Sequence, residues 1–270
     1  MSERHGLLVQ WLEQVLDGAQ PILSAASSDA SFRRYWRFYQ GGRSLIAMDA
    51  PPDKENNAAF VRLAQALRAI GLNVPEIIAE DRERGFLLIS DLGRQLYLDH
   101  LRPDNVDRLY GDAIGALVML QAAVPPIDLP HYDAPFLARE LGIFDEWLLA
   151  GLLRMDIDEA TRAMLDAAYA LLIESALEQP AVCVHRDFHS RNLMLTEPAN
   201  PGILDFQDAV LGPVSYDLVS LLKDCYVDWP RARVIDWTRG YCNLATQSGV
   251  LRVDQEARFL RWFDLMGVQR

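Results

Sequence analysis

Three oxygen-bearing side chains, Asp187, Asn192 and Asp205, stand beside short apolar stretches in the middle of the sequence. The stretches AVCV, NLML and GIL each predict a short strand. A carboxylate can orient or deprotonate a hydroxyl, and carboxylate and amide oxygens are suitable ligands for Mg²⁺ that bridges phosphates. The set therefore favours phosphoryl transfer, with Asp187 near the acceptor hydroxyl and Asn192 and Asp205 holding the metal.

Each of these side chains alone could instead be structural, because Asp and Asn after a strand commonly form turns or caps. Together they favour a site, since strand ends present side chains to a cleft. The five residues from Asp187 to Asn192 leave room for a tight loop. The thirteen residues from Asn192 to Asp205 predict a hairpin that brings the two ligands side by side.

The histidines in this stretch raise a second possibility, because His185, Asp187 and His189 alternate in a pattern that could bind zinc. A zinc hydrolase would need further ligands, and the other histidines are scattered in helical or Pro-rich segments. We expect His185 to act in the catalytic loop by ordering it, and His189 to border the acceptor.

The segments that carry these residues divide into a β-rich part and a helical part. Residues 20–93 predict the order β-β-α-β-β after an amphipathic leading helix, and residues 104–124, 135–153 and 158–178 predict helices. From about residue 214 the chain is again helical, with Trp229, Trp237 and Trp262 as core anchors. The pattern predicts an α+β chain with lobes 1–93 and 94–270.

Composition limits the partners. The net charge is −12 and the pI is about 4.8, which argues against nucleic acid or an anionic membrane as the main partner. Two Lys, Lys54 and Lys223, stand among 26 Lys and Arg, so few residues could serve as a catalytic lysine. Three Cys without CxxC spacing, no signal peptide and no long apolar run indicate the cytoplasm.

The motifs HRDFHSRN and ILDFQD resemble the His-x-Asp-x4-Asn and Asp-Phe-Gly pair of the protein-kinase-like superfamily. They are most similar to the aminoglycoside phosphotransferase/choline kinase branch. The resemblance implies a bilobal protein-kinase-like fold, an N-terminal nucleotide-binding lobe, and ATP with Mg²⁺. The segment GFLLISDLG resembles the hinge strand, where adenine bonds main-chain groups near Ser90, Asp91 and Leu92.

A protein kinase is not favoured, because the segment YDL begins only eleven residues after Asp205 and no Ala-Pro-Glu motif follows. A small acceptor is therefore expected. SSDASFRRYWR, MDAPPDKE, DFHSRNLML and YDLVSLLKDCYVDWP resemble bacterial anomeric kinases of N-acetylmuramate and N-acetylglucosamine in peptidoglycan recycling. That resemblance implies a sugar 1-phosphate product for a separate uridylyltransferase. Kinases of aminoglycosides, choline or homoserine, and a nucleotide-binding pseudokinase, stay open.

The sequence departs from the kinase pattern on the phosphate side. SSDASFRRY replaces a Gly-rich loop, and small residues there, Ser28 and Ser31, could let main-chain amides approach phosphate. The strand SLIAMDA contains no lysine. Either Arg33 or Arg34 substitutes for it, or Mg²⁺ and main-chain amides suffice.

Acceptor recognition is expected in the helical lobe. FLARELGIFDEWLLAGLL resembles the family helix that walls the acceptor pocket, and Trp147 there could stack on a sugar. N-acetylmuramate carries a lactyl carboxylate, and the sequence does not choose among four possible cations: Arg139, Arg186, Arg191 and Lys223. The further substrate-side candidates are Glu140, Asp145, Glu146, His189, Gln207 and Asp208.

Overall fold

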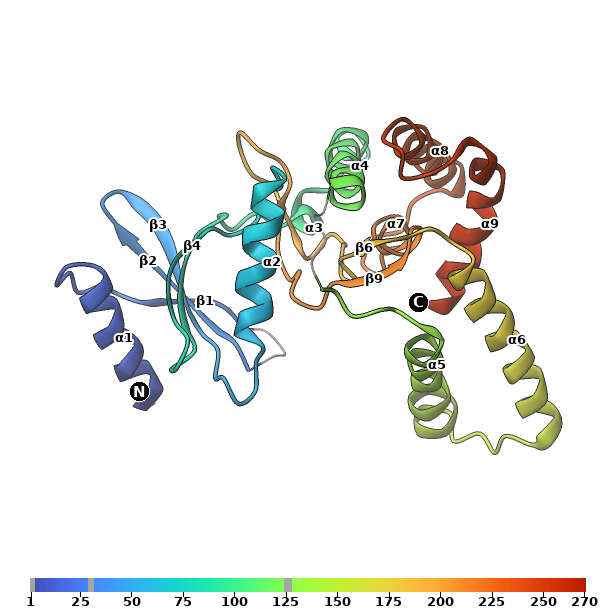
Figure 1. Cartoon of the computed structure of the whole chain (residues 1–270), viewed down its shortest axis with the longest axis horizontal. Coiled ribbons are helices and arrows are strands. Elements are labelled where there is room, and N and C mark those ends of the chain that lie inside the picture. Colours follow the sequence, from blue (N-terminus) through green and yellow to red (C-terminus); the bar gives the residue numbers. More distant parts are fainter. Residues whose placement is uncertain (1–2, 29–31, 124–127) are drawn as a thin grey trace. The chain divides into compact units, whose positions relative to one another are not determined.

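An antiparallel sheet of five strands, in the order β1-β2-β3-β5-β4, forms the centre of the N-terminal part of the chain (Figure 1). The structure is a computed structural model that describes residues 3–28, 32–123 and 128–270. The strands are β1 Ser24–Ser28, β2 Arg34–Gln40, β3 Arg43–Asp49, β4 Ile77–Asp81 and β5 Phe86–Ser90. The predicted order β-β-α-β-β is wrong in one element, because the structure has three strands before the helix and β1 was not predicted.

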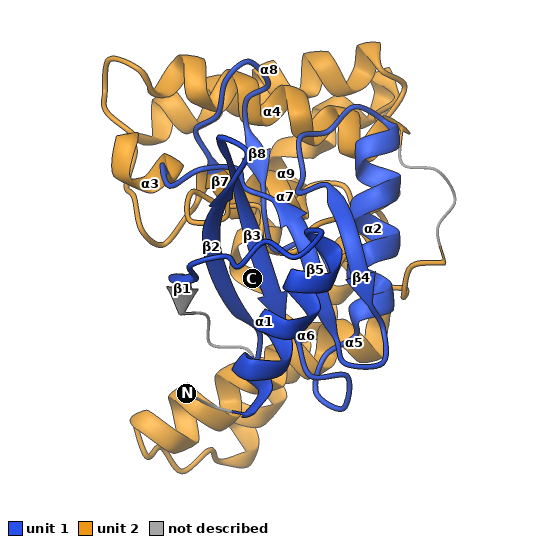
Figure 2. Cartoon of the chain, turned by 90° about the vertical axis from the view of Figure 1, so that its left-hand side faces the viewer, with its two compact units in different colours: residues 1–95, 194–207 blue, residues 96–193, 208–270 orange. Residues whose placement is uncertain are grey.

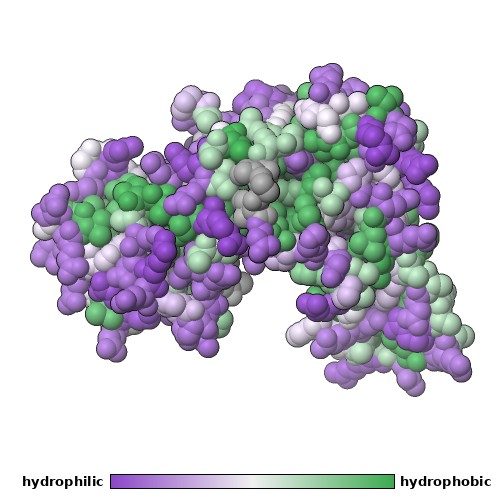
Figure 3. All heavy atoms as spheres, viewed as in Figure 1, coloured by the Kyte–Doolittle hydropathy of each residue, from purple (hydrophilic) through white to green (hydrophobic). Residues whose placement is uncertain are grey.

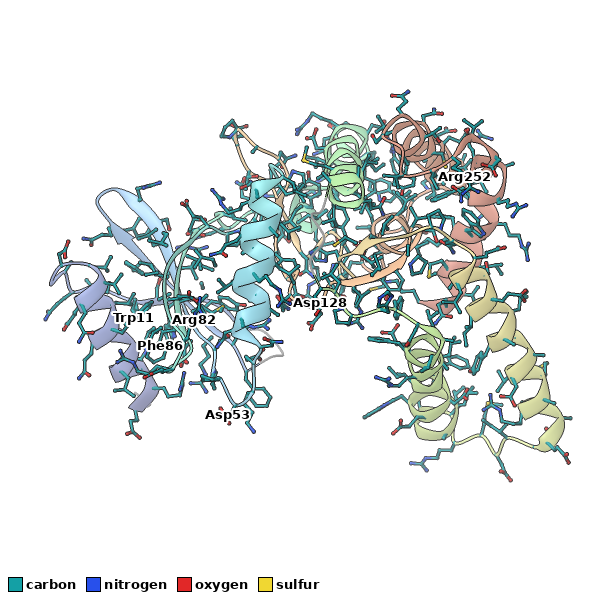
Figure 4. All side chains as sticks on the ribbon, in the orientation of Figure 1. Trp11, Asp53, Arg82, Phe86, Asp128 and Arg252 are labelled. Carbon is teal, nitrogen blue, oxygen red and sulfur yellow. The ribbon has the colours of Figure 1, made fainter. Side chains whose placement is uncertain are left out.

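Two helices cover this sheet. Helix α1, Glu3–Val15, buries Leu8, Trp11 and Leu12 against one face, and Trp11 lies 5.9 Å from the ring of Phe86 in β5 (Figure 4). Helix α2, Asn57–Ala69, lies on the other side (Figure 1). Strand β5 is buried along most of its length, which explains why its sequence is continuously apolar.

A glycine fixes the turn between β4 and β5. Gly85 has φ +74°, and a Cβ there would lie 2.0 Å from the carbonyl oxygen of Ala50. This close approach of two main chains requires glycine, and it connects the turn to the segment that follows β3.

The rest of the chain is mainly helical. Its helices are α3 Tyr97–His100, α4 Val106–Ala123, α5 Ala134–Ile143, the π-helix η1 Phe144–Leu152, α6 Glu159–Leu177, α7 Tyr216–Leu222, α8 Arg231–Gln247 and α9 Val253–Gln269. Short strands β6 Ala181–Val184 and β9 Val210–Pro213 pair with each other, as do β7 Leu193–Met194 and β8 Gly202–Ile203. The predicted α+β kinase-like class is confirmed.

Besides the additional strand β1, two details differ from the sequence prediction. The helix predicted over 135–153 changes to a π-helix at Phe144, where the amide of Leu153 donates to the carbonyl of Leu148. Strand β9 was not predicted, because Gly212 and Pro213 are typical of a break. It forms through pairing with β6, at a position where a Cβ on Gly212 would lie 3.0 Å from Tyr132.

The expected tryptophan anchors occupy different depths. Trp262 and Trp237 are buried. Trp229 is half-buried, and its indole N–H donates to the hydroxyl of Tyr110 at 3.2 Å.

By its internal contacts the chain forms two compact units (Figure 2). Residues 1–95 and 194–207 make up unit 1, and residues 96–193 and 208–270 make up unit 2. Asp205 thus groups with the sheet, although it is distant from it in sequence. The functional assignment of lobes 1–93 and 94–270 stays a prediction.

The surface is polar over much of the face shown in Figure 3, with apolar side chains exposed among the polar ones. On η1 and α6 the exposed apolar side chains include Trp147, Leu152 and Met164. Within the described ranges no helix has the length and apolar character that crossing a bilayer requires.

Candidate active site

The loop between β6 and β7 is closed by hydrogen bonds between its own residues. The amide of His189 donates to the carbonyl of Asp187 at 3.0 Å, and the amide of Asn192 donates to the carbonyl of His189 at 2.9 Å. The Asn192 side chain also donates to the carbonyl of Asp187, at 3.0 Å. This turn holds Asp187 and Asn192 close together, and the side-chain N–H₂ group of Asn192 faces the carbonyl oxygen of Asp187.

A buried carboxylate on α7 anchors the start of this loop. Asp217 is fully buried and accepts the main-chain N–H of His185 at 2.6 Å and that of Arg186 at 3.0 Å. Burial raises the pKa of Asp217 to about 7, although the two N–H donors act in the opposite direction. Arg186 has φ +76°, a strained conformation that its surroundings must hold in place.

A second buried carboxylate anchors the end of the loop. Asp224, just after α7, accepts the main-chain N–H of Ser190 at 3.0 Å and its hydroxyl at 2.5 Å. Its other oxygen accepts the amide of Tyr226 at 3.0 Å. The loop is therefore fixed to the segment 224–226.

Arg186 and His185 point into the fold of unit 2. The Arg186 guanidinium pairs with Glu140 of α5 at 2.7 Å, and Glu140 also accepts the hydroxyl of Tyr132. Burial alone would lower the pKa of Arg186, but Glu140 raises it overall. His185 is 1% exposed, and its Nδ1 accepts the amide of Asp187 at 3.2 Å. This hydrogen bond connects the His185 side chain to the main chain of Asp187.

Asp205 lies in unit 1, directly after β8. Its φ is +63°, and its Oδ1 accepts the side-chain amide of Gln207 at 2.7 Å. Phe206 is buried, and its ring stacks on Phe60 of α2 at 5.0 Å. The buried Phe206 therefore fixes the main chain next to Asp205, whereas Asp208 is exposed.

The predicted metal ligands Asp205 and Asn192 carry oxygen donors. Carboxylate and amide oxygens, as in Asp205 and Asn192, are hard ligands of the kind that Mg²⁺ prefers. Within the part of the chain that the structure describes, no three His, Cys, Asp or Glu side chains form a group that could hold a metal ion. His185, Asp187 and His189, which alternate in the sequence, do not form such a group.

The predicted hinge residues have their side chains occupied. The Asp91 carboxylate accepts from the Arg37 guanidinium at 2.5 and 2.9 Å and from the Ser44 hydroxyl at 2.5 Å. Burial opposes ionisation of Asp91, but hydrogen bonds from Arg37 and Ser44 lower its pKa overall. The Ser90 hydroxyl accepts the amide of Glu76 at 2.8 Å. The side chains of Ser90 and Asp91 are thus already hydrogen-bonded within unit 1.

Arg33 and Arg34, the candidate substitutes for the strand lysine, differ in burial. Arg33 is buried, pairs with Glu55 at 2.8 Å and lies 6.0 Å from the ring of Phe60. Arg34 is exposed at the start of β2. Ser28 ends β1, and Ser31 lies outside the described residues.

The residues predicted to contact the acceptor fall into two groups, exposed side chains and side chains already held in ion pairs. Arg139, Glu146 and Trp147 are exposed, and Trp147 is 69% exposed on η1. Lys223 instead pairs with Asp264 at 3.2 Å and lies over the ring of Phe263. Asp145 pairs with Arg162 at 2.7 Å and accepts from the hydroxyl of Tyr169 at 2.5 Å. Asp145 and Lys223 are thus already ion-paired within unit 2.

Sequence reasoning missed the two anchors, Asp217 and Asp224. One available signal was the aspartate inside YDLVSLL, because a carboxylate within an otherwise apolar helix must find buried donors. Tyr226 was also missed, and its sequence context gives no comparable signal.

Unit 1 contains a cavity away from the residues of the closed loop. A cavity of about 710 Å³ lies at the start of α2 and the β4–β5 turn, where Asp53, Arg82 and Phe86 line it (Figure 4). None of the residues assigned above to phosphoryl transfer lines it.

The sheet, the helical part and the closed Asp187–Asn192 loop together define a kinase-like α+β fold. A choline kinase from Cryptosporidium parvum has the same fold, with a TM-score of 0.69 and 11% identity over 98% of this chain and 86% of that chain. The GDP complex of aminoglycoside 2'-phosphotransferase-IIIa aligns with a TM-score of 0.66 and 14% identity over 99% of this chain and 89% of that chain.

Residues 22–263 match the model of the phosphotransferase enzyme family, and the chain belongs to this family. It is similar to the N-acetylmuramate/N-acetylglucosamine kinase of Pseudomonas aeruginosa, with 51% identity over 92% of this chain and 73% of that protein. The kinase of the same name from Pseudomonas putida is 46% identical over 97% of this chain and 80% of that protein. The predicted resemblance is therefore confirmed.

Proposed function

We propose that the chain is an ATP- and Mg²⁺-dependent kinase that phosphorylates the anomeric hydroxyl of N-acetylmuramate and N-acetylglucosamine. The observation that carries the proposal is the closed loop that ties Asp187 to Asn192 and is anchored by Asp217 and Asp224. Relatives with 46–51% identity over most of the chain are named for these two sugars.

Asp187 is the catalytic carboxylate in this proposal. It accepts the proton of the C1 hydroxyl while that oxygen attacks the γ-phosphorus. The new O–P bond forms as the bond between the γ-phosphorus and the bridging oxygen breaks, which leaves ADP and a sugar 1-phosphate. Asn192 and Asp205 hold Mg²⁺, which neutralises the phosphate charge when it is bound.

The nucleotide contacts come from unit 1. The main chain of Asp91 and Leu92 meets the adenine, since the carboxylate of Asp91 is occupied by Arg37 and Ser44. The positive charge that the lysine-free strand β3 lacks comes from Arg33 or Arg34, or Mg²⁺ and main-chain amides suffice. Arg34 is exposed, whereas Arg33 would have to leave its ion pair with Glu55 to meet phosphate.

The acceptor contacts are proposed from exposed side chains and the loop. Trp147 offers an aromatic face to a sugar ring, and Glu146 can accept bonds from sugar hydroxyls. His189 borders the reacting hydroxyl from within the loop, and Gln207 and Asp208 follow the metal ligand Asp205. We place the reaction in the cytoplasm, where ATP is available, and assign the product to a separate uridylyltransferase.

An acceptor panel tests this proposal. The purified chain is incubated with Mg-ATP and N-acetylmuramate, N-acetylglucosamine, choline, homoserine or an aminoglycoside, and release of ADP is measured. We expect the fastest turnover with the two amino sugars, and a product whose phosphate is acid-labile and lies on C1 by phosphorus NMR. Faster turnover of choline, homoserine or an aminoglycoside would contradict the proposal, and ATP binding without turnover of any acceptor would indicate a pseudokinase.

The role of Asp187 is tested in the same assay. Asp187→Asn should lower kcat by about 10²-fold or more, because general-base catalysis contributes 10²–10⁴-fold, and ATP affinity should change little. Asp236→Asn makes the same chemical change at an exposed position on α8 and serves as the matched control. Equal kcat values for the two variants would remove Asp187 from the chemistry.

A further inference from the structure

Four cations were candidates for a substrate carboxylate, and the structure separates them. Arg186 is paired with Glu140, and Lys223 is paired with Asp264. An ion-paired cation has much of its charge compensated, so recruiting it would break an existing pair. Arg139 and Arg191 are both exposed, and among the described residues neither forms a salt bridge.

Arg191 belongs to the closed loop itself. It lies four residues after Asp187, between Ser190, which Asp224 anchors, and Asn192, which bonds to the carbonyl of Asp187. Four residues span at most about 14 Å even in an extended chain, and this turn is folded back on itself. The Arg191 main chain therefore has a fixed position near the catalytic carboxylate.

The side chain of Arg191 is supported by an aromatic ring rather than by a carboxylate. Its guanidinium lies 5.0 Å from the centroid of the Tyr226 ring, and one N–H donates to the Tyr226 hydroxyl at 3.2 Å. Asp224 holds the main chain of Tyr226 and that of Ser190 at the same time. Stacking leaves the planar edge of a guanidinium able to bind a carboxylate through two parallel N–H bonds.

His189 also contacts the Tyr226 ring. Its ring lies 5.9 Å from that of Tyr226, with an angle of 64° between the two planes. His189, Arg191 and Tyr226 therefore form one cluster on the loop side of unit 2, with a positive charge on an aromatic base. Arg139 is not part of this cluster: it lies on α5, 5.2 Å from the ring of Phe136, and the Arg186 guanidinium lies 5.2 Å from the same ring.

We infer that Arg191, supported by Tyr226, binds the lactyl carboxylate of N-acetylmuramate and sets the preference between the two sugars. This inference rests on the proposed function. The lactyl ether is at C3, which only C2 separates from C1 in the ring, so a sugar whose C1 hydroxyl meets Asp187 carries its carboxylate close to the loop. N-acetylglucosamine has a hydroxyl at C3 instead, and it gains much less from a cation there.

The preference ratio, kcat/KM for N-acetylmuramate divided by kcat/KM for N-acetylglucosamine, is the quantity that tests this inference. We expect Arg191→Gln to lower the ratio by about 10- to 100-fold, the range for loss of a charge-assisted pair to a substrate. Arg191→Lys should lower it less, because lysine keeps the charge but loses the bidentate geometry. Arg139→Gln removes the rival cation and should change the ratio by less than about threefold.

Salt provides a second measurement. Raising the ionic strength from about 0.05 to 0.5 M shortens the screening length severalfold, so the ratio should fall in the wild-type chain and in Arg191→Lys but not in Arg191→Gln. Turnover of N-acetylglucosamine in each variant reports that the site is folded.

The outcomes separate the inference from the proposed function. A ratio that Arg191→Gln leaves within about threefold of the wild type, or one that Arg139→Gln lowers instead, overturns the inference while the proposed function stands. Failure of the wild-type chain to phosphorylate either sugar overturns the proposed function itself.

Discussion

Replacement of Asp217 by Asn tests how the catalytic loop is held. The carboxylate accepts two main-chain N–H groups, from His185 at 2.6 Å and from Arg186 at 3.0 Å, inside unit 2. Asn has one acceptor oxygen, so one of these buried N–H groups would face the amide N–H₂ group. Leaving a buried donor without an acceptor costs about 1–3 kcal/mol. The bond that is lost also helps to hold Arg186 at φ +76°, a conformation worth about 1–3 kcal/mol of strain.

The same replacement removes a buried charge, and its effect therefore depends on pH. Burial raises the pKa of Asp217 to about 7 in the folded chain, from an ordinary value of 3.8. Because the folded pKa is raised, the contribution of Asp217 to stability is fully present below the unfolded pKa and is lost as the pH rises to about 7. The free energy of unfolding of Asp217→Asn, relative to wild type, should rise by about 3 kcal/mol between pH 5 and pH 8.

Urea unfolding followed by tryptophan fluorescence at both pH values measures this difference. Turnover at pH 8 completes the test. There we expect a folded Asp217→Asn variant with kcat lowered about tenfold or more, because small displacements of catalytic groups are costly. Ser220→Ala removes another buried polar side chain from α7 and serves as the control.

Two results would refute the reasoning. A stability difference between Asp217→Asn and wild type that stays constant from pH 5 to pH 8 would mean that the two N–H donors outweigh burial, so the pKa is not raised. Unchanged kcat in a folded variant would mean that Asp217 does not position the loop.

Two further predictions concern unit 1 and the metal. Asp91→Ala leaves the buried Arg37 guanidinium without its carboxylate, and the free energy of unfolding should fall by about 3–5 kcal/mol in urea titrations. Asp53→Ala, which replaces an exposed aspartate, is the control. A loss below about 1 kcal/mol in Asp91→Ala would contradict a structural role for the Arg37–Asp91 pair. Chelation of divalent cations with EDTA should abolish turnover, and added Mg²⁺ should restore it. Asp205→Ala should raise the Mg²⁺ concentration needed for the half-maximal rate by about tenfold or more. Turnover that persists in EDTA would exclude the proposed metal role.

Local signals in the sequence predicted most of the elements, but not β1 or β9, and they identified residues that could do chemistry. The alternation in RYWRFYQ and the apolar run FLLIS predicted strands that the structure contains as β2 and β5. The spacing from Asp187 to Asn192 predicted a tight loop, and three hydrogen bonds within the segment close it. These features depend on near neighbours in the chain, whose types and periodicity a sequence shows directly.

The tertiary structure decided which charged side chains are already occupied and which can meet a substrate. Three cations, Arg186, Arg191 and Lys223, looked equivalent in the sequence. In the structure Arg186 is ion-paired with Glu140 and Lys223 with Asp264. The guanidinium of Arg191 instead lies over the ring of Tyr226. Each partner is between 35 and 46 residues away along the chain. Such pairs arise only when the helices and the loop pack together, because a charge in a partly buried site takes its state from its spatial neighbours.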